Sequence, residues 1–347
     1  MGVDGSNGWQ QTLECIDMAF PDKHATAARV REACVSSGFF YLVNHGVDAE
    51  LLDDVFAQSK KFFSLPLEEK EKVIHDKNHR GYTPFEEEIL DPETQSKGDS
   101  KEGYYVGVHI PESDPRSKKP LHGPNQYPSP DVVPGFQETM DHYHSELTKL
   151  SKRVSRLIAL ALNLEETYFE KPGITDDPMA ALRLLHYSEE KSNIELGIYG
   201  TGAHSDYGLI TLLATDEVPG LQICRDKDAV PQVWEEVPPM KGAYIVNLGD
   251  MLERWSNGLF RSTLHRVISQ GVERYSLPFF FEPNYDCLVE CLPTCCSKDN
   301  PPKYPPMTSG EHLLSKYQQT HKGFDSKKKL GHQELEAHRN QTTFDST

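Results

Sequence analysis

The pattern of apolar and polar residues changes period within the first third of the chain, which predicts alternating strands and helices. Apolar runs over 14–20 and 38–47 are typical of strands, and the second is apolar enough to be buried. The segments 22–36 and 49–63 are each expected to form a helix. Residues 76–130 lack a sustained period and are rich in glycine, proline and charge, so we expect loops with one short strand near 104–108.

A long helix is predicted over 134–164, because its apolar residues recur every three or four positions on one stripe. The stripe comprises Met140, Tyr143, Leu147, Leu150, Val154, Leu157 and Ala161. After this helix the pattern changes to short apolar segments with turn signals between them, at 181–187, 209–215, 221–224, 232–237, 242–250, 262–268 and 275–283. So many short strands in close succession argue for a double-sheet jelly roll.

Together these patterns predict a mainly β protein with flanking helices, organised in three regions. Residues 11–130 would form an N-terminal region of helices and strands packed on the core. Residues 131–320 would hold the long helix and the jelly-roll core. The last region, 321–347, is polar and uneven, so a disordered tail is expected there.

The charge balance disfavours two classes of partner. The chain of 347 residues has 36 Lys and Arg against 53 Asp and Glu, a formal net charge of −17, which repels nucleic acid and anionic membranes. No apolar run approaches the roughly 20 residues needed to cross a bilayer, and the N-terminus lacks a signal-peptide layout. We therefore expect a soluble, cytoplasmic monomer that acts on a small molecule, with no nucleic-acid or membrane partner.

The cysteines do not suggest a disulfide framework, because there are seven of them, an odd number. Reduced thiols are expected instead. Four of them, Cys287, Cys291, Cys295 and Cys296, form a cluster. Their spacing does not match the usual pairs of a zinc knuckle, which disfavours structural zinc.

Candidate chemistry begins with His-x-acid triplets, of which about two are expected by chance in this composition. Three occur in the sequence. The triplet at 144–146 lies on the predicted long helix, where residues two apart point to different sides, and the one at 332–334 lies in the polar tail. His204 and Asp206 stand at the entrance of a predicted strand, where residues i and i+2 share a face. That pair could reach one metal ion, or could equally well bond the surrounding loop.

A third ligand would favour the metal interpretation. Non-haem Fe(II) oxygenases bind iron through two histidines and one carboxylate and leave three positions for co-substrate and dioxygen. His265, in the predicted strand 262–268, could complete such a set. Taken alone, it would be better interpreted as a core histidine.

Arg274 and Ser276 lie two residues apart in the next predicted strand, on one face, with Phe280 on the same side. A guanidinium and a hydroxyl are costly to bury in an apolar pocket unless they meet an anion, and Arg suits bidentate contact with a carboxylate. This predicts a site for a dicarboxylate co-substrate. The alternative is that Arg274 pairs with an internal acid such as Glu282, or lies at the surface.

With His204, Asp206, His265, Arg274 and Ser276 in place, the chain resembles the plant-type Fe(II)- and 2-oxoglutarate-dependent dioxygenases of the isopenicillin N synthase-like superfamily. The resemblance covers about residues 11–320 and includes "GFFYLVNHGV", "FFSLPLEEK", "VNLGDMLERWSNGLFRSTLHRV" and "RYSLPFFFEPN". It implies a double-stranded β-helix core of the jelly-roll, cupin-like type. It also implies that the two histidines and Asp206 ligate Fe(II), and that Arg274 and Ser276 hold the distal carboxylate of 2-oxoglutarate.

The same resemblance implies the reaction. Oxidative decarboxylation of 2-oxoglutarate to succinate and CO2 would be coupled, with dioxygen, to hydroxylation, demethylation or desaturation of a substrate, with ascorbate as reductant. Tyr187 matches a tyrosine that contacts the co-substrate, whereas Leu185 departs from the Asn of many relatives. Asp206 argues against halogenation, since related halogenases lack that carboxylate. The Arg-x-Ser pair also occurs in the isopenicillin N synthase and aminocyclopropane-carboxylate oxidase branches, so 2-oxoglutarate is expected here as the commoner case.

The candidate substrate residues are Arg183, Tyr207, Glu88 and Phe280. The first two match positions in the branch that contains the ethylene-forming enzyme and homoarginine or arginine hydroxylases, although that branch's Glu-x-Thr would fall at 88–90, where the Thr is missing. The acidic run 86–88 indicates either a cationic substrate or a solvated loop. We expect an enzyme of plant specialised metabolism that oxidises a small nitrogen-containing metabolite, such as an alkaloid or amino-acid derivative. The alternatives are a homoarginine or arginine hydroxylase, and a catalytically silent binding or sensor protein.

Overall fold

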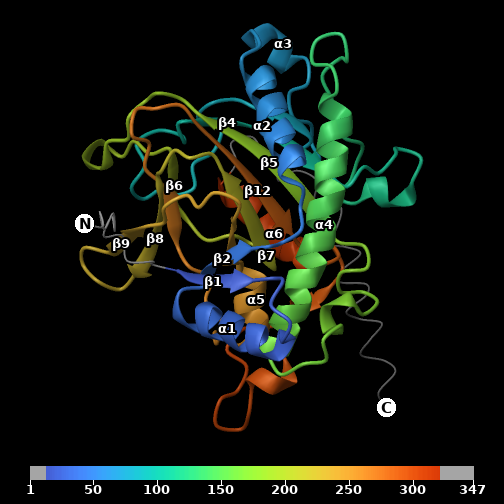
Figure 1. Cartoon of the computed structure of the whole chain (residues 1–347), viewed down its shortest axis with the longest axis vertical. Coiled ribbons are helices and arrows are strands. Elements are labelled where there is room, and N and C mark those ends of the chain that lie inside the picture. The colour runs from blue at the N-terminus through green and yellow to red at the C-terminus, as the bar shows by residue number, and fades with distance from the viewer. Residues whose placement is uncertain (1–12, 321–347) are drawn as a thin grey trace, which may run out of the picture.

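Two β-sheets and a layer of helices make up the molecule, which the computed structural model describes for residues 13–320 (Figure 1). The predicted tail, 321–347, lies outside the described residues. Apolar side chains from both sheets, among them Phe39, Tyr41 and Ile223, pack together in a small cluster. This arrangement confirms the mainly β jelly roll with flanking helices that the strand pattern predicted.

The larger sheet has eight strands in the spatial order β1-β2-β10-β7-β12-β5-β4-β3. β1 and β2 are parallel, and the other neighbours are antiparallel. In chain order these strands are β1 Glu14–Asp17, β2 Phe39–Val43, β3 Gly81–Thr83, β4 Lys101–Gly107, β5 Ala180–Tyr187, β7 Ile210–Thr215, β10 Tyr244–Leu248 and β12 Arg274–Phe281. The N-terminal strands therefore extend the sheet of the later strands at both edges.

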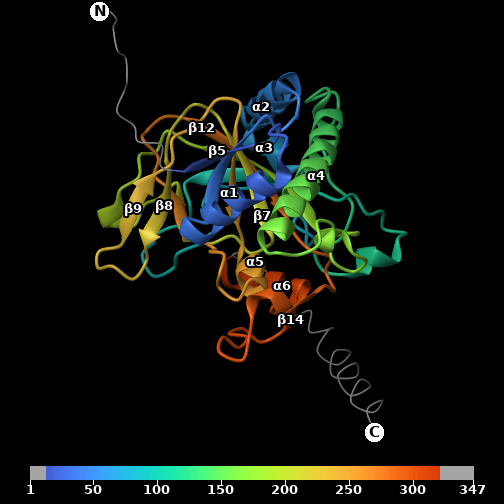
Figure 2. The same cartoon turned by 60° about the horizontal axis from the view of Figure 1, so that its bottom comes forward.

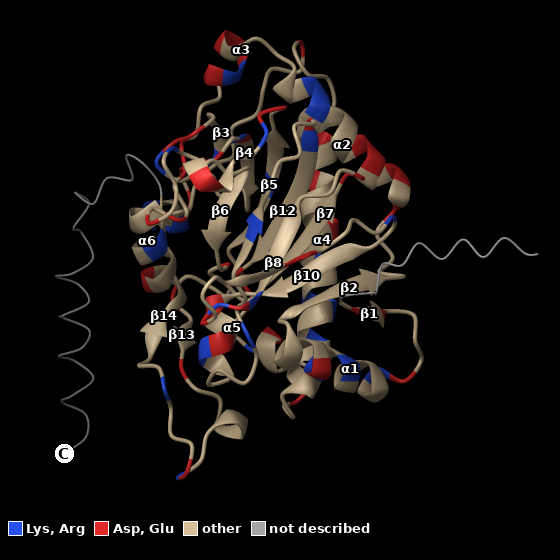
Figure 3. Ribbon diagram, turned by 90° about the vertical axis from the view of Figure 1, so that its left-hand side faces the viewer, with Lys and Arg blue, Asp and Glu red and all other residues tan. Residues whose placement is uncertain are grey.

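The smaller sheet has the order β6-β11-β8-β9 and lies on the side of the molecule that faces the viewer in Figure 3. Its strands are β6 Thr201–His204, β8 Leu221–Asp226, β9 Val233–Glu236 and β11 His265–Val267. A separate two-stranded ribbon joins β13 Leu288–Val289 to β14 Met307–Thr308.

Three helices cover the outer face of the larger sheet: α1 Lys23–Ser36, α2 Ala49–Phe63 and α4 Phe136–Ala161 (Figures 1 and 2). The side chains of Asp22 and Asp48 accept backbone N–H bonds at the first turns of α1 and α2, which explains where these helices begin. The apolar stripe predicted for the long helix faces the main core, where Met140, Leu147 and Leu150 are completely buried.

Alternation along β12 separates this core from the inner face of the sheet. Tyr275, Leu277, Phe279 and Phe281 belong to the main core. The intervening residues, from Arg274 onward, therefore project to the opposite side, toward the smaller sheet. The same period-2 pattern that predicted the strand thus also decides which of its residues can reach a site between the sheets.

Several elements were not expected from the sequence: α3 Leu67–Glu71, α5 Asp250–Trp255, α6 Ser309–Thr320, β3, β6 and the β13–β14 ribbon. The predicted strand 242–250 ends at Leu248, and α5 follows almost directly. α6 is held onto α5 by an ion pair of 2.8 Å between Lys316 and Asp250. Short helices depend on such tertiary contacts more than on local sequence, which is why the pattern did not reveal them.

β4 begins three residues earlier than the short strand expected near 104–108. The reason is that Lys101 and Glu102 are buried as ion pairs, with Asp99 and Lys70 respectively, although their charge suggested a loop. Elsewhere, acidic and basic residues are mixed along the outer helices (Figure 3). Among the described residues, no helix has both the length and the apolarity that crossing a membrane requires.

The packing of α4 generates a stability prediction. Leu150→Ala removes a completely buried side chain from the main core, so we expect it to lower the free energy of unfolding by about 2–5 kcal/mol. Lys149→Ala, on the exposed side of the same helix, is the control and should change it by less than about 0.5 kcal/mol. Urea unfolding followed by circular dichroism measures both. Equal effects of the two changes would show that α4 does not pack as described.

Candidate metal centre

Two histidines face each other across the pair of strands β6 and β11. His204 is the last residue of β6, His265 is the first residue of β11, and the two are direct partners in the antiparallel register. Their ring centroids are 4.2 Å apart. Asp206 follows in the turn after β6, and one ligand atom from each of the three residues lies within 4.8 Å of the others.

Backbone carbonyls fix the orientation of both imidazoles. His204 Nδ1 lies 2.9 Å from the Gly202 carbonyl oxygen, and His265 Nδ1 lies 3.1 Å from that of Thr263. Each Nδ1–H therefore donates to a carbonyl, and each Nε2 faces the other candidate ligands. Burial, together with the neighbouring His265, lowers the pKa of His204 to about 3, so its ring is neutral at ordinary pH.

The carboxylate of Asp206 is oriented by two donors. Its Oδ2 accepts hydrogen bonds from the Thr211 hydroxyl and, at 2.7 Å, from the Asn247 side-chain amide. Its Oδ1 is then turned toward the histidines, 3.7 Å from His204 Nε2 and 3.6 Å from His265 Nε2. Two imidazole nitrogens and one carboxylate oxygen on the same side of a site are the donor set that suits non-haem Fe(II).

The reason expected for this convergence was wrong in one respect. His204 and Asp206 do not share a strand face, because β6 ends at His204 and β7 begins only at Ile210. The turn between the strands carries Asp206 back under the imidazoles, and Thr211 and Asn247 hold it there. Within residues 13–320, this trio is the one group of three or more His, Cys, Asp or Glu residues that could hold a metal ion.

Arg274, Ser276 and Tyr187 also come together, and all three are buried. Arg274 pairs with Tyr187 in the register of β12 and β5, and its guanidinium lies over the Tyr187 ring at 4.9 Å. Its Nε donates to the Val218 carbonyl at 3.2 Å, but its buried Nη1 has no hydrogen-bond partner among residues 13–320. The guanidinium therefore has a donor ready for an anion, and no contact with Glu282 satisfies it.

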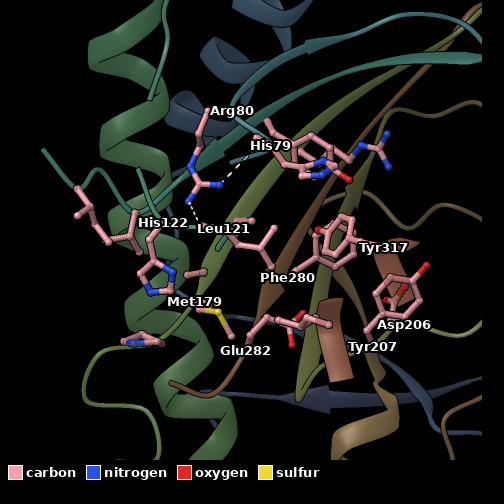
Figure 4. A pocket seen from close by; sticks show the side chains of 18 of the residues that line it. His79, Arg80, Leu121, His122, Met179, Asp206, Tyr207, Phe280, Glu282 and Tyr317 are labelled. Atoms are coloured by element: carbon pink, nitrogen blue, oxygen red, sulfur yellow. Dashed lines mark hydrogen bonds between the residues drawn. The ribbon is translucent and has the colours of Figure 1, made fainter. Parts of the chain in front are cut away.

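A cavity opens beside His204 and Asp206, with about 990 Å³ of empty space, part of it open to solvent (Figure 4). All four candidate substrate residues, Arg183, Tyr207, Glu88 and Phe280, line it. Most of the other lining side chains are apolar or aromatic, among them Leu90, Tyr105, Val108, Ile110, Leu121, Met179, Leu313 and Tyr317. Apolar lining with a few polar groups is typical of small-molecule sites.

The acidic run lies partly in solvent, because Glu86 is exposed and Glu87 half-buried, whereas Glu88 is buried. Glu86 lies 3.2 Å from Lys97, and Glu87 lies 3.5 Å from His75. Glu88 is buried and makes a bidentate pair with Arg183 at 2.8 and 2.9 Å, with Lys101 at 2.9 Å on the same carboxylate. The carboxylate at the cavity wall is therefore neutralised by residues of this chain.

Several functional candidates escaped the sequence argument. Glu282 lines the cavity directly after β12, and burial, together with Asp206 nearby, raises its pKa well above the usual range. Its carboxyl fits closely against Gly208, where a Cβ atom would collide with the carboxyl group. α6 contributes Leu313 and Tyr317 to the lining. The alternation of β12 could have indicated Glu282, but no local pattern marks α6 as a cavity wall.

Comparisons with known proteins agree with this geometry. Residues 13–130 match the family model described as non-haem dioxygenase in morphine synthesis N-terminal, and residues 178–283 match the 2OG-Fe(II) oxygenase superfamily. Kihadalactone A synthase LFS of Citrus sinensis is 47% identical over 91% of this chain and 95% of its own length. Azadirone synthase LFS of Melia azedarach is 46% identical, over 88% and 92%. The crystal structure of a full-length Neurospora crassa protein in complex with alpha-KG has a TM-score of 0.76 at 31% identity, over 88% of this chain and 96% of that one.

The two donors to Asp206 give a test of the metal centre. Thr211→Val removes one hydrogen bond from Oδ2 while keeping the side-chain shape, so the carboxylate is freer to turn away. We expect metal affinity to fall by about tenfold, as for other outer partners of metal ligands. Titration of the apo protein with Co(II), followed by absorbance, measures it. Thr148→Val, which removes a hydroxyl bond within α4, is the control, and an equal loss in both variants would contradict the assignment.

Proposed function

This chain belongs to the 2OG-Fe(II) oxygenase superfamily, and we propose that it oxidises a C–H bond of a small, largely apolar molecule. It is an oxidoreductase that uses Fe(II), with 2-oxoglutarate as co-substrate. When bound, iron with 2-oxoglutarate and dioxygen supplies the oxidising power, and 2-oxoglutarate leaves as succinate and CO2. The residues of the chain bind, orient and shield the reactants.

His204, Asp206 and His265 are proposed as the iron ligands. The observation that carries this proposal is the convergence of the Nε2 atoms of both histidines on one oriented carboxylate oxygen, at 3.6 and 3.7 Å. The donor set fits Fe(II), and three ligands leave room on the metal for co-substrate and dioxygen. This supports an enzyme over a silent binding protein, because a binding pocket alone would not need three such groups directed at one point.

Arg274 and Ser276 are proposed to hold the distal carboxylate of 2-oxoglutarate, with Tyr187 beside it. The fit rests on the buried Nη1 of Arg274, a charged donor without a partner in the described structure, which a carboxylate would satisfy. Leu185, which pairs with Ser276 in the register, offers no polar side-chain contact to the co-substrate. The proposed site therefore depends chiefly on the guanidinium.

The lining of the cavity supports a substrate with a mainly apolar skeleton. Apolar and aromatic side chains predominate, and the ion pair between Glu88 and Arg183 leaves no net charge at that part of the wall. The two LFS relatives are named as synthases of kihadalactone A and azadirone. We propose that the substrate of this chain is similar in skeleton to those compounds and is positioned by Phe280 and Tyr207 close to the metal site.

A nitrogen-containing metabolite, the substrate expected from the sequence, is the second candidate. Glu88 supports it, because a carboxylate on the cavity wall could receive a cationic group if Arg183 turned away. A guanidino compound would have to compete with both Arg183 and Lys101 for that carboxylate. The net charge of −17 supports a monomer that acts on a free small molecule, and we propose that this enzyme is cytoplasmic.

The proposed function is tested by succinate formation from 2-oxoglutarate. The purified protein with Fe(II) and ascorbate should release succinate, and candidate substrates of both classes should accelerate the release. His265→Ala should abolish iron binding and turnover together, because two ligands hold the metal far less well than three. Succinate formation by His265→Ala at the wild-type rate, or no iron binding by the wild type, would reject the proposal.

The co-substrate role of Arg274 has its own test. Arg274→Ala removes the partner of the distal carboxylate, so the apparent affinity for 2-oxoglutarate should fall at least about tenfold. Iron binding should persist, since Arg274 is not among the three candidate ligands. Arg29→Ala, at an exposed ion pair with Glu14, is the control. An unchanged KM for 2-oxoglutarate in Arg274→Ala would exclude the role.

A further inference from the structure

Asp99 lies just before β4, almost completely buried, and reaches the strand that carries the first histidine of the metal centre. We propose that Asp99 is a positioning residue, which holds His204 in its metal-binding orientation through the backbone N–H and carbonyl of Gly202. This inference rests on the proposed function, since it assigns the residue a part in holding the iron ligand. It adds a residue that contacts neither metal nor substrate.

The connection consists of two hydrogen bonds through one backbone residue. The Gly202 N–H donates to Asp99 Oδ1 at 2.9 Å, and the Gly202 carbonyl oxygen lies 2.9 Å from His204 Nδ1. The hydrogen bond from the Gly202 N–H to the Asp99 carboxylate fixes the position of this part of β6. The imidazole, bonded to the carbonyl of the same residue, is thereby fixed in both place and tautomer.

The strand is also pinned to the loop that carries Asp99. Ser100 N–H donates to the Tyr199 carbonyl, and Ser96 N–H donates to the Gly197 carbonyl, each at 3.0 Å. Gln95 packs directly against Gly202, where an added Cβ atom would lie 2.2 Å from the Gln95 side-chain oxygen. Close packing of this loop leaves the beginning of β6 little freedom to move. A change at Asp99 should therefore alter the position of the His204 side chain.

Asp99 must be a carboxylate, because each of its described hydrogen-bond partners is a donor. Oδ1 accepts from Gly202 and from the Gln95 side-chain amide at 2.8 Å, and Oδ2 accepts from the Lys101 ammonium. An asparagine at this position would have to direct its NH2 group at one of these donors. Asp99→Asn is therefore close in shape but wrong in hydrogen bonding.

The same carboxylate joins the metal strand to the wall of the cavity. Lys101 bridges Asp99 to Glu88, and Glu88 continues to Arg183, so charges alternate along a buried chain. Buried ion pairs of this kind contribute little net stability compared with apolar packing. Their position between the cavity and His204 suits them to fixing geometry.

The test compares two buried carboxylates, those of Asp99 just before β4 and of Glu102 within it. Glu102, like Asp99, is bonded to donors, namely Lys70 and Tyr82, with His186 at 2.8 Å, but none of these touches the metal centre. Asp99→Asn and Glu102→Gln should therefore destabilise the fold to a similar extent. Co(II) titration of the apo proteins, read from the ligand-field spectrum, should show affinity about tenfold weaker for Asp99→Asn and unchanged for Glu102→Gln.

Gln95→Ala serves as a second variant, because it removes one of the donors to Asp99, at a partly exposed loop position, and leaves the core intact. It should weaken Co(II) binding by about threefold. Wild-type affinity in Asp99→Asn, or in Gln95→Ala if the former does not fold, would overturn the inference while leaving the proposed function intact. An equal loss in Glu102→Gln would also overturn it, since the effect would then be one of general stability. Failure of the wild type to bind Co(II) or Fe(II) would instead remove the proposed function.

Discussion

The orientation of one carboxylate determines whether the two histidines can act as a metal centre. Asp206 lies in a turn, where an aspartate would ordinarily point to solvent or bond its own backbone. Thr211 from β7 and Asn247 from β10 engage Oδ2, so that Oδ1 faces both imidazoles. These donors belong to the larger sheet and the histidines to the smaller one. The site therefore forms only where the two sheets are packed against each other in the correct relative position.

Early and late parts of the chain both contribute strands to the larger sheet. Strands from the first hundred or so residues form both edges of the larger sheet, while its centre comes from the later residues. Three helices bury the outer face, so the inner face of β12 is free to present Arg274 and Ser276. Arg274, with its buried donor, stands at the start of β12, whereas Phe280, near the end of the strand, lines the largely apolar cavity.

The charges around the centre are arranged to be internally balanced. Burial works against the charged form of Lys101, but the carboxylates of Asp99 and Glu88 raise its pKa, so it remains a cation. Glu88 is in turn paired with Arg183. A neutral wall built from charged residues can position a strand firmly and still accept an apolar substrate.

Local pattern predicted much of this, and the parts it missed have a common cause. The helix over 49–63 has the bounds expected, and the alternation of β12 placed Arg274, Ser276 and Phe280 on one face. In contrast, the support of the centre by Asn247 and Asp99 spans 41 and 103 residues of sequence. No periodicity or motif spacing encodes such pairs, and an aspartate in a turn has the same local signature whether or not it is held toward a metal.

Anomalous diffraction from crystals grown with Fe(II) and 2-oxoglutarate under anaerobic conditions tests the central claim most directly. The account predicts one iron peak between His204 Nε2, His265 Nε2 and Asp206 Oδ1, with 2-oxoglutarate bridging from the iron to the Arg274 guanidinium. An iron peak within bonding distance of other residues instead, or co-substrate density away from Arg274, would contradict the account.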